Sequence, residues 1–218
     1  MSAVHDSKLV KLETFRALRA KLVQPPAAAS RECVPTGVAA LDETVGGLPK
    51  GALTEFSGST GHGSLFFSAL LETACRERWH IGLIDAADEF EPADWDATAL
   101  HRVLWVRCTE AKKALRVADL LLRDGNLPLL VLDFQGVPVA QLRGIPTNVW
   151  HRFQRVVEQS GVVMVALTRR PMVEGARVRI EAETPLHLNA MRIKRRDLVA
   201  RMSVRIRQKG REALRRIA

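Results

Sequence analysis

The chain has 218 residues, 47% of them apolar, and a net charge of +9. This length and composition suit one α/β domain with additions and a sizeable core. Every apolar run is shorter than the roughly 18 residues that a membrane-spanning helix needs, which excludes a membrane protein of that kind, and we expect no membrane partner.

The start of the chain and its cysteines indicate a compartment. Residues 1–8 are polar and lack the apolar core of a signal peptide. Cys33, Cys75 and Cys108 lie far apart and are odd in number, which is typical of free thiols in a reducing compartment. We therefore expect a cytoplasmic protein without a bound metal.

The positive charge is concentrated near one end of the sequence. The chain holds 33 Lys and Arg and 24 Asp and Glu, and residues 191–218 hold 11 of the former and two of the latter. A local basic stripe predicts a polyanion partner, and we expect DNA; an acidic protein surface and a solubilising tail are the alternatives. No aromatic residue stands in the stripe, which argues against base stacking. The expected DNA-binding residues are Arg192, Lys194, Arg195, Arg196, Arg201, Arg205, Arg207 and Lys209.

An amphipathic helix is the first predicted element. Residues 8–22 place apolar side chains at spacings of three and four, and a Pro- and Ala-rich linker follows at 24–30. The stripe has two open interpretations, which are packing on the chain's own core and packing on a partner or a second copy of the chain. The apolar stripe consists of Leu9, Leu12, Phe15, Leu18 and Leu22.

Strands and helices then alternate along the chain. Continuous apolar runs predict buried strands, and apolar positions that repeat every three to four residues predict helices between them. Strands that are apolar on both faces indicate a mainly parallel sheet with helices on both sides. The expected strands are 51–57, 81–85, 102–107, 127–133 and 161–168, and the expected helices are 63–78, 109–123 and 149–159.

The pattern changes to a period of two after residue 175. Val178 and Ile180 alternate with polar residues, and so do Met202, Val204 and Ile206. This period predicts an antiparallel extension of the sheet. The polar face of its last strand is expected to form a row of guanidinium groups. That face consists of Arg201, Ser203, Arg205 and Arg207.

The turn between the first strand and the first long helix has the spacing of a phosphate-binding loop. Gly58 and Gly63 occupy the two glycine positions of the pattern G-x-x-x-x-G-K-[ST], with Gly61 between them. The next residues are Ser64 and Leu65, in place of the lysine that meets the phosphates and the hydroxyl that ligates Mg²⁺. The turn is expected to keep the geometry of a nucleotide site without its charge.

Other residues of this region carry smaller expectations. The backbone N–H groups of residues 60–64 lie at a helix N-terminus and would bind an anion weakly, so weak ATP binding stays open although we expect no cofactor. His62 is expected to be a solvated surface group. Trp150 is expected to be buried rather than to stack on a base.

The order of these features resembles the RecA-like ATPase core. Residues 35–42 and 46–51 resemble the stretch before its phosphate loop, residues 84–92 its second strand and carboxylate segment, and residues 129–133 the strand with its metal-site acid. Within this superfamily the short length, the leading helix with Leu and Arg and the lost lysine most resemble ImuA. That family consists of RecA-like proteins of bacterial DNA-damage-inducible mutagenesis cassettes. The resemblance covers roughly residues 8–208.

The resemblance implies an accessory role in SOS mutagenesis, the error-prone translesion synthesis that follows DNA damage. The implied partners are DNA, an inactive ImuB-like polymerase subunit, an error-prone polymerase and a RecA-type protein. The chain would consist of an N-terminal helix and linker at 1–30, a RecA-like core at 31–190 and a basic strand and tail at 191–218.

The RecA pattern also implies roles for individual positions. Asp133 is the expected metal-site acid that is still present, so it completes the degenerate site formed by the Gly-rich loop. Ala87 stands at the place of the catalytic glutamate, with Asp88 and Glu89 beside it. Thr168 stands near the place of a nucleotide-sensing glutamine.

These departures predict a protein without ATP turnover. Phosphoryl transfer depends on electrostatic stabilisation, and one lost donor removes roughly 3–4 kcal/mol by analogy with oxyanion sites. Two alternatives stay open. The chain is either an ATPase that borrows Arg169 or Arg170 of a neighbouring molecule, or a protein–protein regulator such as a cell-division inhibitor of the same broad fold.

Overall fold

The computed structural model describes residues 32–208 and 211–217. The chain divides into two compact units, Met1–Glu32 and Cys33–Ala218, and the fold below is that of the second unit. The predicted helix at 8–22, with its stripe from Leu9 to Leu22, lies outside the described residues, as does Lys209.

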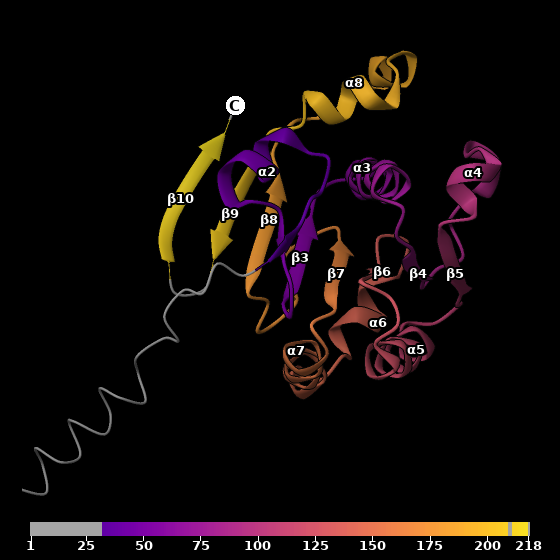
Figure 1. Cartoon of the computed structure of the whole chain (residues 1–218), viewed down its shortest axis with the longest axis vertical. Coiled ribbons are helices and arrows are strands. Elements are labelled where there is room, and N and C mark those ends of the chain that lie inside the picture. The colour runs from indigo at the N-terminus through magenta and orange to yellow at the C-terminus, as the bar shows by residue number, and fades with distance from the viewer. Residues whose placement is uncertain (1–31, 209–210, 218) are drawn as a thin grey trace, which may run out of the picture. The chain divides into compact units, whose positions relative to one another are not determined.

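One mixed sheet forms the centre of the second unit (Figure 1). Within the described residues it has eight strands in the order β10-β9-β8-β3-β7-β6-β4-β5. The strands from β8 to β5 pair in parallel, and β9 and β10 are antiparallel. The predicted α/β fold, a mainly parallel sheet with an antiparallel C-terminal extension, is therefore confirmed. The strands are β3 Leu53–Ser57, β4 Ile81–Asp85, β5 Val103–Arg107, β6 Leu129–Asp133, β7 Val163–Thr168, β8 Val178–Ala182, β9 Val204–Gln208 and β10 Arg211–Ile217, and a separate pair consists of β1 Cys33–Val34 and β2 Leu48–Pro49.

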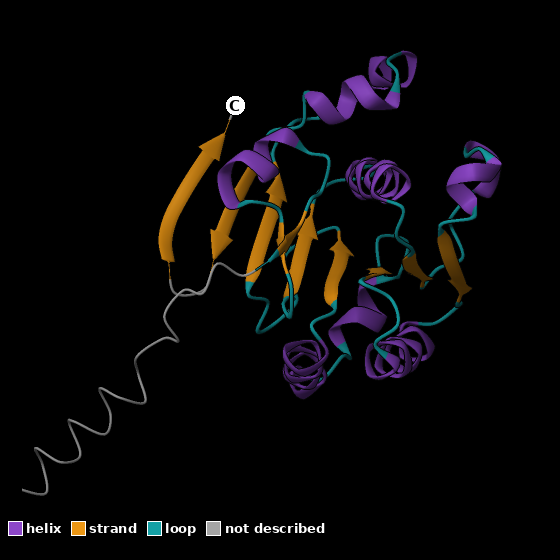
Figure 2. Ribbon diagram, in the orientation of Figure 1, coloured by secondary structure: helices purple, strands orange, loops and turns teal. Residues whose placement is uncertain are grey.

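Helices cover both faces of the sheet (Figure 2). One apolar core lies between one face of the sheet and the helices α2, α3, α4 and α8. A second core lies between the opposite face and the helices α5, α6 and α7. The predicted helices and strands of the parallel part begin and end within two residues of the observed ones. The helices are α2 Ala39–Val45, α3 His62–Glu77, α4 Ala97–Leu100, α5 Ala111–Asp124, α6 Val139–Arg143, α7 Thr147–Ser160 and α8 Arg195–Ala200, with short 3-10 helices η1 Pro92–Asp94 and η2 Leu188–Arg192.

The structure corrects three sequence predictions. β8 is parallel to β3, so the antiparallel part begins only at β9. β5 is an edge strand of the described sheet and not a buried one, since Leu104 is 45% exposed. Arg201 caps the end of α8 and does not belong to β9, which begins at Val204. A period of two gives the faces of a strand but not the direction of its neighbour.

No helix in the described part of the chain is both long and apolar enough to cross a bilayer. The same part contains no cluster of His, Cys, Asp and Glu with metal-ligand geometry.

Candidate functional site

The Gly-rich loop joins β3 to α3 at the carboxyl end of the parallel strands. Its first glycine, Gly58, donates its N–H to the carbonyl of Thr168 at the end of β7, at 3.1 Å. Gly61 has a φ of 91°, which L side chains rarely adopt. The strand, turn and helix therefore follow one another as the glycine spacing predicts.

The two positions after the loop have neither the lysine nor the second-position hydroxyl of the phosphate-loop pattern. Ser64 is exposed on the first turn of α3, where the phosphate-loop pattern has its lysine. Leu65 is 7% exposed and packs in the core on the α3 face. The loop therefore has neither the cation nor the Mg²⁺ ligand that phosphoryl transfer uses.

The prediction that His62 is a solvated surface group is wrong, because this side chain is 2% exposed. Its Nε2 lies 2.6 Å from the carbonyl oxygen of Thr184, so Nε2 carries the proton and donates it. Its Nδ1 lies 3.0 Å from the hydroxyl and 3.1 Å from the carbonyl oxygen of Ser59. The His62 N–H also donates to the Ser59 carbonyl, at 3.2 Å. His62 therefore connects the loop to the segment after β8. Because its backbone N–H is already bonded to Ser59, this N–H is not available to an incoming anion.

Gln135 occupies the space beside the second glycine of the loop. A Cβ at Gly63 would meet the Gln135 amide, so any larger residue here would displace that side chain. The Gln135 side chain is 9% exposed, and its Nε2 is buried without a partner among the described residues. The sequence analysis missed Gln135, and its position two residues after Asp133 is the signal that was available.

Asp133 ends β6 beside this loop. Its pKa is raised to about 7. Burial is the main cause, the nearby Asp85 and Glu89 act in the same direction, and the Gln135 N–H, which donates to Asp133 Oδ1 at 2.8 Å, opposes the shift. The acid is therefore partly protonated near neutral pH. Such a group is a weak metal ligand unless a cation displaces its proton.

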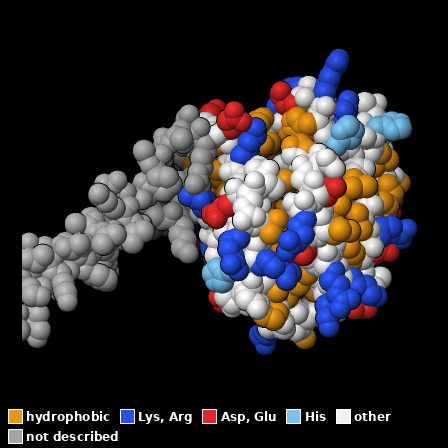
Figure 3. Space-filling view, turned by 60° about the horizontal axis from the view of Figure 1, so that its bottom comes forward, with side chains coloured by type: hydrophobic (Ala, Val, Ile, Leu, Met, Phe, Trp, Pro, Cys, Tyr) orange, Lys and Arg blue, Asp and Glu red, His pale blue; other side chains and the backbone are white. Residues whose placement is uncertain are grey.

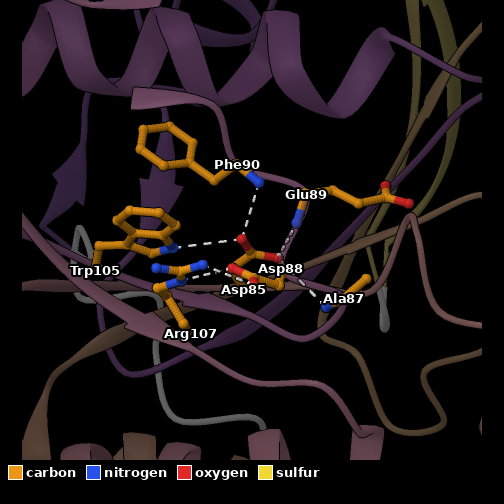
Figure 4. A network of polar contacts seen from close by, with 7 residues as sticks. All are labelled: Asp85, Ala87, Asp88, Glu89, Phe90, Trp105 and Arg107. Atoms are coloured by element: carbon orange, nitrogen blue, oxygen red, sulfur yellow. Dashed lines mark hydrogen bonds and ion pairs between the residues drawn. The ribbon is translucent and has the colours of Figure 1, made fainter. Parts of the chain in front are cut away.

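Asp85 ends the neighbouring strand β4 and organises the loop that follows it (Figure 4). This carboxylate is 3% exposed. Its Oδ2 accepts the N–H of Phe90 at 2.8 Å and the indole N–H of Trp105 at 3.3 Å. Its Oδ1 accepts the N–H groups of Ala87 and Glu89 at 3.3 and 3.1 Å. Because these bonds use both oxygens, Asp85 has a structural role. Its place at the end of an apolar run was the signal in the sequence.

The two acids that follow Ala87 in this loop point in different directions. Asp88 points outward and holds Arg107 with two bonds of 2.7 and 2.8 Å, which lower the Asp88 pKa (Figure 4). Glu89 points toward β6, where its carboxylate abuts Gly136. Of the residues at the place of the catalytic glutamate, Glu89 and not Ala87 therefore lines the same cavity as Asp133.

These groups surround a small cavity, here named the phosphate-loop cavity, of about 140 Å³. Ser64 lies on its wall, together with the aromatic side chains of Phe67, Phe90 and Trp95. Its one cationic lining residue, Arg195, stacks 4.6 Å from the Trp95 ring and pairs with Asp94 at 3.2 Å. The acids that line this cavity are Glu89, Glu91, Asp94 and Asp133. A cavity with this charge repels a phosphate group.

Glu55 is a second buried acid that the sequence analysis missed. It is 1% exposed in the middle of β3, and burial raises its pKa. Its Oε1 accepts the Thr168 hydroxyl at 3.2 Å and the N–H groups of Met172 and Val173 at 2.6 and 2.9 Å. Its Oε2 lies 3.3 Å from Arg179. A charged residue inside an otherwise buried run was the available signal.

This network fixes the loop that follows β7. Thr168, near the expected place of a nucleotide-sensing glutamine, is fully buried and turned toward Glu55 rather than toward the phosphate-loop cavity. Arg169 and Arg170 are exposed at the start of the same loop. Both stay available to a neighbouring molecule.

The guanidinium row predicted for the last strand is neutralised by carboxylates on its neighbour. On the face of β8 and β9 that points away from α3, Arg205 pairs with Glu183, and Arg207 lies 3.7 Å from Glu181. Arg195 pairs with Asp94, as described above. Three of the predicted DNA-binding residues are therefore engaged with acids of the chain itself. Folding brings these acids, Glu181, Glu183 and Asp94, from other elements, which the local sequence does not show.

The other predicted cations that the structure describes are exposed to solvent. They lie on and around η2 and α8, are all exposed, and form no ion pair with any residue that the structure describes. We name them the free cations. The free cations are Arg192, Lys194, Arg196 and Arg201.

Positive charge on the opposite side of the unit is mixed with acids. Figure 3 brings forward the side that carries α5 and α7 and shows Lys and Arg groups with Asp and Glu among them. Asp119 pairs with both Arg123 and Arg152, and Glu158 pairs with Arg177. This face therefore carries several acids among its cations, whereas Asp197 is the one acid in the sequence of η2 and α8.

Comparisons with known proteins support a RecA-like relationship for about half of the chain. No family model matches. The chain is 34% identical over 121 residues to RecA of Leifsonia xyli subsp. xyli, which covers 52% of this chain and 34% of that protein. It is 31% identical over 121 residues to RecA of Streptomyces ambofaciens (52% and 32%) and 30% identical over 125 residues to RecA of Bifidobacterium breve (52% and 31%). The chain thus spans about a third of the length of these relatives.

Proposed function

We propose that this chain is a non-catalytic RecA-fold accessory protein in DNA-damage-induced, error-prone translesion synthesis. The observation that carries the proposal is the phosphate-loop cavity, where Ser64 replaces the lysine and four acids face the place of the phosphates. With four acids and one cation among its described lining residues, this cavity disfavours a triphosphate by charge. The RecA relationship supplies the theme of DNA repair, and the resemblance to ImuA narrows it to SOS mutagenesis.

The proposed partners follow from the same two sources. The free cations suit DNA, since they have no acids of their own to neutralise them. An ImuB-like polymerase subunit, an error-prone polymerase and a RecA-type protein are the protein partners that the resemblance implies. The protein would act in the cytoplasm.

Complementation of damage-induced mutagenesis tests the proposal in a strain that lacks the gene. We expect Asp133→Asn and Glu89→Gln to restore mutagenesis fully, because neither carboxylate performs chemistry. We expect replacement of Arg192, Lys194 and Arg196 by Ala to fail. Purified protein should release no phosphate from ATP, with or without DNA. Loss of mutagenesis in a folded Asp133→Asn protein would contradict the non-catalytic role, and full mutagenesis in the deletion strain would contradict the role in translesion synthesis.

A divergent ATPase is the second candidate, and one observation favours it. Glu89 and Asp133 lie at the same cavity, so two carboxylates remain where an ATPase would bind metal and activate water. The missing cation would come from Arg169 or Arg170 of a second molecule. This candidate predicts ATP hydrolysis that rises with the square of protein concentration and disappears in Asp133→Ala.

A further inference from the structure

A second cavity, of about 290 Å³, lies between the start of α3, the segment 184–193 and α8. We name it the α3–α8 cavity. It shares no lining residue with the phosphate-loop cavity. His62 and Leu186 separate it from the Gly-rich loop, since His62 bonds to Thr184 and Leu186 lies against Gly61. The apolar part of its wall includes Leu65, Leu186, Ala190, Ile193, Leu198 and Met202.

The charge around this cavity has one sign. Arg201 lines it, and the other free cations flank it on η2 and α8. No acid is found among the described residues that line the cavity. Asp197 is the one acidic residue in the sequence between residues 184 and 208. An occupant should therefore combine an apolar group with negative charge.

The lining favours an apolar side chain over a nucleobase. A base needs a ring on which to stack and partners for its polar edge, and no Phe, Tyr or Trp lines this cavity. An apolar side chain needs neither. The volume lies near the lower limit of small-molecule sites, which is enough for one or two side chains of a peptide.

We propose that the α3–α8 cavity takes an apolar anchor residue of an acidic peptide segment from a partner protein. The anchor fills the cavity, and flanking Asp or Glu residues pair with Arg201 and the neighbouring free cations. Buried anchors carry most of the binding energy in such complexes, and rim charges mainly steer association. The inference rests on the cavity and its rim, and it stands whether or not the protein acts in translesion synthesis.

A subtractive selection tests the proposal on the full chain. A phage-displayed library of random peptides is depleted on Ala190→Trp, whose indole fills the cavity, and then selected on the unchanged protein. Ala200→Trp is the matched control, because Ala200 is exposed on α8 and does not line the cavity. We expect selected peptides to combine Leu, Ile, Met or Phe with Asp or Glu. They should bind Ala190→Trp roughly tenfold or more weakly than either other protein.

A second pair of variants keeps the test decisive if Ala190→Trp does not fold. Arg201→Glu changes an exposed rim residue, and Arg155→Glu makes the same change on α7, against the other sheet face. We expect only Arg201→Glu to weaken peptide binding, by roughly tenfold. Selected peptides without acidic residues, an absence of enrichment, or equal binding to Arg201→Glu and Arg155→Glu would overturn the proposal. Loss of oligothymidine binding in folded Ala190→Trp would assign the cavity to a nucleobase and overturn it as well.

Discussion

Single residues decide which contacts the Gly-rich loop makes. Ser64 and Leu65 remove the charge and the metal ligand, and His62 turns inward to bond to Thr184. Asp133 keeps its place but not its usual acidity, since burial beside Asp85 and Glu89 favours the protonated form. An acid that is partly neutral in an acidic cavity suits packing better than Mg²⁺ binding.

The raised pKa of Asp133 predicts a specific dependence of stability on pH. Its folded-state pKa of about 7 exceeds the ordinary value of 3.8, so the folded state binds the proton more tightly than the unfolded chain. The resulting stabilisation is complete below about pH 4 and is lost as the pH rises through 7, at up to about 1.4 kcal/mol per pH unit. Asp133→Asn removes this dependence, and we therefore expect its free energy of unfolding to exceed that of the unchanged protein increasingly from pH 5 to pH 7.

Urea unfolding at pH 5, 6 and 7 measures this difference. Asp124→Asn is the matched control, because Asp124 is an exposed acid at the end of α5. A constant difference between Asp133→Asn and the unchanged protein over this range would show that Asp133 titrates normally.

At the scale of elements, buried charge fixes the loop that follows β7. Glu55 on β3 holds three donors from β7 and residues 172–173, and Arg179 on β8 lies on its other oxygen. One carboxylate thus joins the central strands to the loop that begins with Arg169 and Arg170. Removal of one partner from such a network leaves buried groups unsatisfied, which costs more than the bonds themselves contribute.

Substitution of Glu55 should therefore be severe and should depend on the replacement. We expect Glu55→Ala to lower the free energy of unfolding by at least about 3 kcal/mol, because three donors and Arg179 lose their partner. We expect Glu55→Gln to cost less, because its amide oxygen still accepts from the same donors. Denaturant unfolding of both variants measures this order. Equal destabilisation would assign the effect to the charge alone.

At the scale of the whole second unit, the sheet decides which cations are available. Glu181 on β8 and Glu183 directly after it face the arginines of β9. Acids that stand among the cations of α5 and α7 reduce the positive charge of that side (Figure 3). The exposed, unbalanced positive charge of the described C-terminal segment therefore gathers at η2 and α8, beside the α3–α8 cavity.

This distribution predicts which arginines contribute to DNA binding. We expect replacement of Arg192, Lys194 and Arg196 by Ala to reduce the slope of log affinity against log salt by about two to three, roughly one for each phosphate contact. We expect the Arg205→Ala, Arg207→Ala double variant to leave the slope nearly unchanged, because both side chains pair with acids at the end of β8 or directly after it. Titration of fluorescent DNA over a salt series measures both slopes. A larger reduction in the double variant would mean that those ion pairs open on binding.

The sequence by itself determined the fold class and most element bounds, because apolar periodicity and glycine spacing are local signals. It also determined the loss of the phosphate-binding lysine, since Ser64 is a matter of residue identity. Only the tertiary structure decided that His62 is buried, that Glu89 rather than Ala87 approaches Asp133, and that Arg205 and Arg207 are neutralised. Each of these features depends on the path of a loop or on groups that folding brings together from separate elements. The energy of a buried or paired charge is set by those neighbours in space and not by its neighbours in sequence.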